Sequence, residues 1–267
     1  MRTKGTAAGT ATTAKKVNYA TPALEKGLDI VELLAHQAEG LTKTQLARQL
    51  NRTVSEIFRM LLCLERRGYI AQIAEDRYSL TLKLFELVQE HPPTERLLAD
   101  ALPIMKRLAA ETHQSCHLGV LEGDKVVILA QVNSPTNLGF YVKLGSTVDL
   151  MESASGYVVL AHQTDEERER ALENWRVRNN RRPPTDLMRH IDRIRKSGFE
   201  KRESYLVKGV LNISFPVLDA RGSALGALTI PFIQYSGSDV PQKTVIEKLR
   251  NAATEITAAI GGRASAE

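Results

Sequence analysis

Two helix starts of the same form follow each other near the beginning of the chain, and they limit the fold more than any other feature. Thr42 is followed three residues later by Gln45, and Thr53 is followed three residues later by Glu56. At this spacing each side chain satisfies a free backbone N–H group of the other residue in the first turn of a helix. The sequence therefore predicts two short helices joined by a tight turn.

The flanking segments extend this pair in a recognisable order. A first helix is expected in "TPALEKGLDIVELLA", with Pro22 in its first turn and one apolar stripe made by Leu24, Leu28, Val31 and Leu34 or Ala35. Gly68 ends the third helix, and "YIAQI" and "RYSL" then form a small hairpin. Three helices followed by a hairpin within about 65 residues are typical of a winged helix-turn-helix.

This arrangement gives a function to the start of the third helix, "NRTVSEIFRM". If that helix enters the major groove of DNA, its first two turns face bases and phosphates. Arg and Ser/Thr side chains can bind phosphate oxygens, and Arg can also bind a guanine edge. We predict that the DNA-binding residues are Thr42, Arg52, Thr53, Ser55, Glu56, Arg59 and Arg77. The alternative is that this charged face is only solvated.

The net charge of +5 gives DNA binding limited support, because the excess lies in the first residues. Residues 1–17 contain four basic residues and no acidic residue, and we expect residues 1–18 to be a disordered basic tail. Such a tail adds a salt-dependent attraction to phosphates that is independent of sequence. The chain has no run of 18 apolar residues and no apolar signal segment at its start, so we expect a cytoplasmic protein without membrane contact.

After a helical segment over residues 82–112, the pattern indicates a second domain of mixed helices and strands. Strands are expected in "HLGVLEGDKVVILAQV", "GFYVKLG", "VLNISFPVL" and "SALGALTIPFI", and helices in "ASGYVVLAHQ", "DEERERALENW", "DLMRHIDRIRKSG" and the segment from residue 242 to residue 262. Most neighbouring strands are joined by short turns. The predicted fold class is therefore α+β with a mostly antiparallel sheet.

Catalytic, cofactor and metal motifs are scarce, and we assign no catalytic residue, no cofactor and no metal ligand. There is no P-loop, GxSxG, HExxH or Gly-rich dinucleotide motif. His113, Cys116 and His117 are the nearest candidate for a metal or Cys/His site. If residues 115–121 form a strand, Cys116 and His117 point to opposite faces, so a structural role or an ordinary surface position is expected.

The last hairpin gathers polar groups on one face. With a four-residue loop at residues 219–222, Asn212 pairs with Thr229 and Ser214 with Ala227. Alternation then places Asn212, Ser214 and Thr229 on one face and apolar residues on the other. This face either contacts water or forms part of an apolar pocket with a few hydrogen-bonding groups.

Several segments in the same order resemble the family of IclR-type bacterial transcriptional regulators. They include "TPALEKGLDIVELLA", "TVSEIFRMLLCLERRGYI", "VKLGSTVDLMESASGYVVLA" and "SGFEKRESYLVKGVLNISFPVLDARGSALGALTIPF", so the resemblance covers nearly everything after residue 19. It implies a winged helix-turn-helix joined by a helical linker, which mediates dimerisation, to a GAF-like α/β effector-binding domain with antiparallel sheet. The expected domains are residues 19–81, 82–112 and 113–262.

The resemblance also implies an effector site after the "LG" strand and in the final hairpin. The residues carried over are Leu150, Ala154, Ser155, Gly156, Asn212, Thr229 and Pro231, and Arg202 is added as a counter-charge for an organic acid. This chain departs from the family at Asn212, where a Cys is frequent, and at Tyr157, where a Lys usually follows the Gly. The family also often has an acidic residue in the stretch "EKRESYLVKG", where the corresponding positions hold Arg202, Ser204 and Tyr205.

These features predict a ligand-responsive regulator that binds a palindromic operator in double-stranded DNA and is at least a dimer. The resemblance implies a homodimer or tetramer. We expect Leu97, Leu98, Ala101, Met105 and Leu108 to form an apolar dimer surface on the linker helix, and Pro103 to kink that helix. Three other classes stay open: an enzyme with its pocket in the second domain, an architectural DNA-binding protein without an effector, and a sensor that acts through a protein partner.

Overall fold

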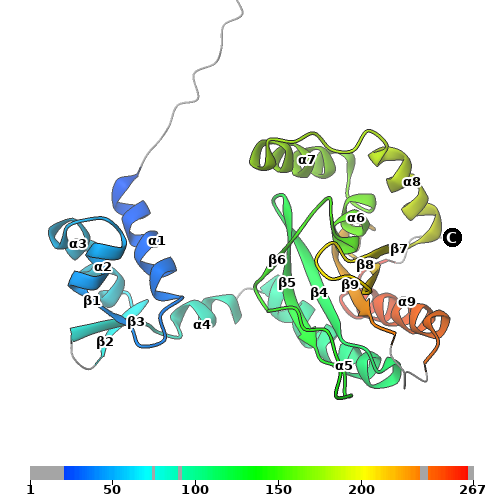
Figure 1. Ribbon diagram of the computed structural model, residues 1–267, viewed down its shortest axis with the longest axis horizontal. Helices are drawn as coiled ribbons and strands as arrows, with labels where there is room; N and C mark the ends of the chain where they lie inside the picture. Colours follow the sequence, from blue (N-terminus) through cyan, green and yellow to red (C-terminus); the bar gives the residue numbers. More distant parts are fainter. Residues whose placement is uncertain (1–20, 74–75, 90–91, 235–239, 264–267) are drawn as a thin grey trace, which may run out of the picture. The chain divides into compact units, whose positions relative to one another are not determined.

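The computed structural model of the chain describes residues 21–73, 76–89, 92–234 and 240–263 (Figure 1). The chain forms two compact units, residues 1–90 and residues 91–267. The division falls inside the segment 82–112 that we expected to be one linker. The basic tail predicted for residues 1–18 lies outside the described residues.

The first unit contains the predicted helices and hairpin. They are α1 (Pro22–Leu34), α2 (Lys43–Gln49), α3 (Val54–Arg66), β2 (Ile70–Ile73) and β3 (Arg77–Leu80), followed by α4 (Lys83–Gln89). Both predicted capping boxes are present, with Thr42 and Thr53 as the N-caps of α2 and α3. A two-residue strand, β1 (Leu41–Thr42), adds to β3 and makes a three-stranded sheet in the order β1-β3-β2.

The core of the first unit shows that the predicted stripe on α1 was partly wrong. Ile30 and Leu34 are the buried residues of α1, whereas Leu24 and Leu28 are 59% and 51% exposed. Ile57 and Leu61 of α3 are buried with them. Both faces of α1 carry apolar residues at helical spacing, so periodicity alone did not identify which of them packs on α3.

The second unit is built on a six-stranded sheet in the order β6-β5-β4-β9-β8-β7, with every neighbouring pair antiparallel. The strands are β4 (Cys116–Glu122), β5 (Lys125–Val132), β6 (Thr147–Asp149), β7 (Glu200–Glu203), β8 (Leu211–Leu218) and β9 (Ala224–Phe232). The helices are α5 (Pro92–Thr112), α6 (Ala154–Ala161), α7 (Asp165–Asn179), α8 (Leu187–Ser197) and α9 (Gln242–Ala259). The predicted α+β class is confirmed.

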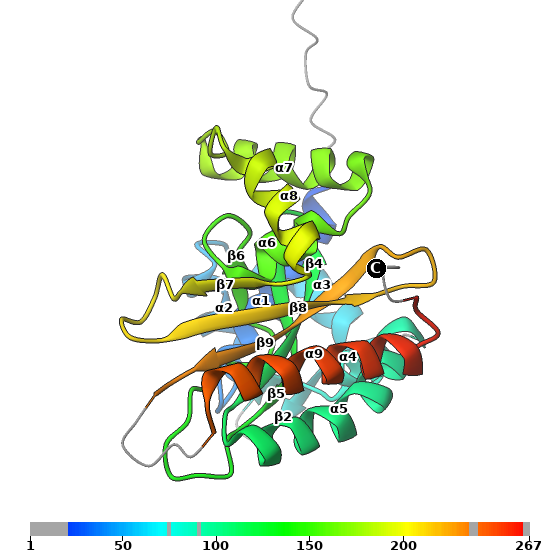
Figure 2. The ribbon, with the colours of Figure 1, turned by 90° about the vertical axis from the view of Figure 1, so that its right-hand side faces the viewer.

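Helices cover both faces of this sheet (Figure 2). α5 and α9 pack together on one face over side chains such as Cys116, Ile213 and Leu228. α6 packs on the other face, and α8 packs on α6. Burial of these two apolar layers stabilises the unit, at about 25 cal/mol for each Å² of apolar surface removed from water.

The predicted dimer surface on the linker helix was wrong. Of its five residues Leu98 is partly buried, and the others are buried in the core under α9 and the sheet: Leu97, Ala101, Met105 and Leu108. α5 is therefore a structural helix of the second unit. It is a single helix through the exposed Pro103.

Two expectations about strands also need correction. Residues 139–145 form no strand, and the strand beside β5 is β6, three residues long, after a turn at Gly145 with φ of 74°. In the last hairpin Ser214 pairs with Thr229, and Asn212 pairs with Pro231. The register shifts between Val217 and Leu218, and the total slip from our prediction is two residues, which leaves every side chain on its predicted face.

Candidate functional site

The candidate DNA-binding surface lies on α3. Ser55 and Arg59 are exposed on this helix, and within the part of the chain that the structure describes neither side chain has a hydrogen bond or an ion pair. They are four residues apart and so lie on the same side of the helix, one turn from each other. Their side chains are available for a ligand such as DNA.

The other residues predicted on α3 and its turn make contacts inside the unit. The Arg52 guanidinium donates to the Asp29 carboxylate at 2.9 Å and joins the turn to α1. Thr53 accepts from the Glu56 N–H at 3.3 Å and donates its hydroxyl to the Glu56 carboxylate at 2.9 Å. Hydrogen bonds from Thr53 hold the pKa of Glu56 below its ordinary value, and Lys26 lies 3.5 Å from that carboxylate. These three residues hold the helix in place.

Thr42 and Arg77 lie beside each other in the small sheet, where they pair across β1 and β3. Thr42 caps α2, and Arg77 donates to the carbonyl of Gly40 at 3.2 Å. Both residues therefore join the helix pair to the hairpin. α3 also exposes Phe58 and Leu62, two large apolar side chains that the sequence analysis did not include in the surface.

The second unit contains a cavity of about 210 Å³ on the α6 side of the sheet. Strands β4, β8 and β9 supply three polar residues, and the start of α6 supplies two serines and an alanine. Strand β6 supplies a valine, and the segments 140–143 and 204–207 supply the rest. The lining residues are His117, Phe140, Tyr141, Val142, Lys143, Val148, Ser153, Ala154, Ser155, Ser204, Tyr205, Leu206, Val207, Asn212 and Thr229.

Four of the predicted effector residues line this cavity: Ala154, Ser155, Asn212 and Thr229. The other four, Leu150, Gly156, Arg202 and Pro231, are absent from its lining. Leu150 is fully buried, and a Cβ on Gly156 would come within 2.3 Å of the Leu150 carbonyl oxygen. Gly156 is therefore required for close packing of α6 on the segment before it.

Arg202 lies at the edge of the site. It pairs with Asn212 across β7 and β8, and its guanidinium stacks over the Tyr157 ring at 4.6 Å from the ring centroid. Pro231, opposite Asn212 on β9, is buried. Arg202 is thus held beside the cavity by an aromatic ring.

The start of α6 places polar groups in the cavity wall. The Ser153 side chain is the N-cap of α6 and accepts from the Gly156 N–H at 3.0 Å, and Ser155 donates its hydroxyl to Ser153 at 3.3 Å. No intrahelical carbonyl is available to the first N–H groups of a helix. Together with the positive end of the helix dipole they favour an anion.

Burial shifts the pKa values of two adjacent residues of β4 in opposite directions. Cys116 lies in the core below α5, with its sulfur 3.5 Å from the Met105 carbonyl oxygen, and burial raises the pKa of its thiol to about 12. His117 points to the opposite face, as strand alternation predicted, and its burial lowers its pKa to about 4. The imidazole is therefore neutral at physiological pH.

Sequence reasoning missed His117 and both loop segments of the cavity. Alternation along β4 separates His117 from Cys116, and pairing of β4 with β9 places His117 opposite Thr229. That signal required knowing that β4 and β9 are neighbours. The segment 140–143 was predicted as part of a strand, and the segment 204–207 has no periodic pattern that would place it against the sheet.

Asp149 connects the cavity to α7. Its carboxylate accepts from the indole N–H of Trp175 at 3.0 Å, and its backbone N–H donates to the hydroxyl of Tyr205 at 3.4 Å. Tyr205 lines the cavity, and Trp175 is the only tryptophan of the chain. A change at the cavity wall can therefore reach the indole through one residue.

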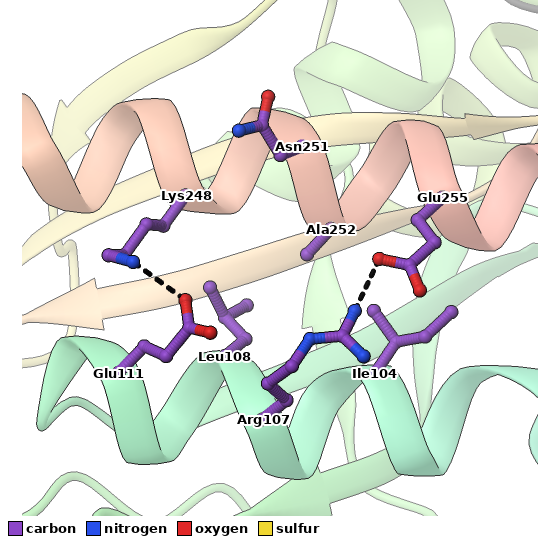
Figure 3. A pocket seen from close by; sticks show the side chains of 8 residues that line it. All are labelled: Ile104, Arg107, Leu108, Glu111, Lys248, Asn251, Ala252 and Glu255. Atoms are coloured by element: carbon purple, nitrogen blue, oxygen red, sulfur yellow. Dashed lines mark hydrogen bonds and ion pairs between the residues drawn. The ribbon is translucent and has the colours of Figure 1, made fainter.

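A second depression, about 130 Å³ in volume, lies between α5 and α9 (Figure 3). Its charged residues pair across the two helices: Arg107 with Glu255, and Lys248 with Glu111 at 2.7 Å. Because these charges are already paired, the depression offers less to a ligand than the cavity beside α6 does.

Comparison with known proteins supports a two-part regulator. Residues 94–258 match the family described as "Bacterial transcriptional regulator IclR C-terminal", and residues 23–74 match the "IclR helix-turn-helix domain". The HTH-type transcriptional regulator KdgR of Escherichia coli is 30% identical over 241 residues, which cover 88% of this chain and 91% of that protein. The HTH-type transcriptional regulator BhcR of Paracoccus denitrificans is 25% identical over 249 residues, 91% of this chain and 89% of that protein.

Solved structures share the fold. An IclR homologue of Microbacterium hydrocarbonoxydans, crystallised as a complex with 4-hydroxybenzoate, has a TM-score of 0.73 at 20% identity and covers 90% of this chain and 99% of its own. The Thermotoga maritima IclR has a TM-score of 0.68 at 22% identity, covering 89% and 98%. With both domains matched, the chain belongs to the family of IclR-type bacterial transcriptional regulators, which combine a helix-turn-helix domain with a ligand-binding domain.

Proposed function

We propose that this regulator reads its operator with the face of α3 that carries Ser55 and Arg59. The observation that carries the proposal is that these two side chains are exposed and unpartnered among the described residues, whereas Arg52 and Glu56 are held by neighbours. In helix-turn-helix proteins the second helix of the pair enters the major groove with its first turns toward the bases. Arg52, Thr53 and Glu56 then act by orienting α3.

The effector we propose is a small organic acid bound in the cavity beside α6. The described residues that line the cavity include Lys143 and no acidic side chain, and the start of α6 adds N–H groups suited to a carboxylate. The apolar walls, Phe140, Val142 and Val148, suit a hydrocarbon or aromatic body. The related protein crystallised with 4-hydroxybenzoate is an example of this ligand class in the same fold. Arg202 remains a candidate counter-charge at the edge of the cavity.

We further propose a homodimer or tetramer on a palindromic operator, in the cytoplasm and without catalytic activity. One small winged helix reads few base pairs, so specificity against a genome requires two half-sites. The apolar surface that we propose for self-association lies on α4, where Phe85 is 62% exposed and Leu84 and Leu87 are exposed as well. No helix within the described ranges is long and apolar enough to span a membrane.

The DNA proposal is tested with Arg59→Ala. The operator is first selected from random DNA with the wild-type protein, and affinities are then measured at several salt concentrations. A lost base contact weakens binding by about 1–3 kcal/mol, and a lost phosphate contact lowers the salt slope by about one unit.

The matched control is Arg193→Ala, which removes the same charge from an exposed position of α8 in the other unit. It is expected to leave both quantities unchanged. A folded Arg59→Ala protein with wild-type affinity and wild-type salt slope would remove Arg59 from the interface.

A further inference from the structure

The imidazole of His117 is a buried polar group without a partner. The residue is 6% exposed and lies opposite Thr229 on the neighbouring strand. Its Nδ1 atom is completely covered, and within the described part of the chain neither ring nitrogen makes a hydrogen bond. Buried side-chain nitrogens are seldom left in this state, because each unmade hydrogen bond costs free energy.

The surrounding polar groups do not relieve this cost. The Thr229 hydroxyl is paired with the Ser214 hydroxyl at 2.6 Å, and both residues are buried. Ser153 is occupied as the cap of α6. His117 also lines the cavity, together with Asn212 and the start of α6. A polar group that lacks a partner and lies in a cavity wall is expected where a ligand supplies the missing hydrogen bond.

The charge state limits what His117 can bind. Desolvation lowers its pKa to about 4, so at neutral pH the ring offers one N–H donor and one lone pair but no positive charge. A carboxylate is therefore stabilised less by this neutral ring than by the start of α6 or by Lys143. A hydroxyl, in contrast, can donate to the lone pair of the ring or accept from its N–H, and a carbonyl can accept from that N–H.

We propose that His117 is a specificity-determining residue of the effector site, and that it hydrogen-bonds an uncharged hydroxyl or carbonyl group of the ligand. This inference rests on the proposed effector cavity. The ligand then carries two polar ends, an acid group held near α6 and an uncharged group held at the sheet. An analogue without the second group leaves the ring nitrogens unpaired, and a site of this kind rejects such analogues strongly.

The first test needs no ligand. His117→Phe keeps a planar ring and removes both orphan nitrogens, so the midpoint of thermal unfolding is expected to stay the same or to rise. The control is Gln114→Leu, because buried Gln114 makes two hydrogen bonds to Ile233, one of 3.1 Å to its carbonyl and one of 3.0 Å from its N–H. Gln114→Leu is expected to lower the midpoint. A comparable loss in His117→Phe would assign His117 a structural role and overturn the proposal.

The second test is calorimetry with two matched pairs of acids, 4-hydroxybenzoate with benzoate and 2-oxobutanoate with butanoate. Wild type is expected to prefer the hydroxy or oxo acid of at least one pair by roughly tenfold or more, and His117→Phe to lose that preference while it still binds the plain acid. An equal preference in both proteins would overturn the role of His117. If wild type binds none of the four acids, the acid class of the proposed function fails, and the ligand half of this inference fails with it. The unfolding comparison separately decides whether His117 is structural.

Discussion

Acid should destabilise this protein through His117, and the size of the effect follows from its burial. The pKa of His117 is lowered from 6.5 to about 4 in the folded state. Between these two values the unfolded chain binds a proton that the folded chain does not, so stability is lost as the pH falls through this window. A shift of about 2.5 units at about 1.4 kcal/mol per unit gives roughly 3 kcal/mol lost between pH 7 and pH 4.

Urea unfolding of wild type and of His117→Phe across this pH range isolates the effect. The other titratable groups are common to both proteins, including His162, whose pKa burial also lowers. The difference between the two pH profiles is therefore assigned to His117. We expect the variant to keep about 3 kcal/mol more of its neutral-pH stability at pH 4. Parallel profiles would show that the imidazole is not desolvated as the structure has it, and would refute this reasoning.

Three further predictions concern packing, assembly and signal. Met105→Ala is expected to lower the free energy of unfolding by about 2–5 kcal/mol in denaturant titration, because Met105 is a core residue. The oligomeric state is expected to stay the same. Dissociation of the oligomer without loss of stability would show instead that α5 forms the dimer surface. Phe85→Asp is expected to reduce self-association in sedimentation, and an unchanged assembly would exclude this part of α4. An acid that contacts Tyr205 is expected to change the fluorescence emission of Trp175 through Asp149. Binding that is detected by calorimetry without a change in this emission would contradict the prediction.

Local chemistry made much of the fold predictable. The two capping boxes require only residues three positions apart, so the starts of α2 and α3 followed directly from Thr42 and Thr53. Strand alternation also held, since it placed Cys116 and His117 on opposite faces and kept Asn212, Ser214 and Thr229 on one face.

What failed depends on contacts between distant segments. The apolar stripe predicted on α5 is present, but it packs on α9 and on the sheet of the same unit. The spacing of apolar residues along a helix does not show which surface covers them. The hairpin register was missed because it depends on an irregularity after Val217. The cavity includes segment 140–143, which was predicted as part of a strand, and segment 204–207, which carries no periodic signal. Half of the predicted effector residues are absent from its lining.

A genome-wide map of the DNA sites bound by the full-length protein tests the central claim most directly, especially when it is repeated with Arg59→Ala. The account predicts a small set of promoter sites that share a two-fold symmetric motif, and a loss of most of these sites in the variant. Binding spread evenly along the chromosome, or an identical set of sites for both proteins, would contradict a regulator that reads its operator with α3.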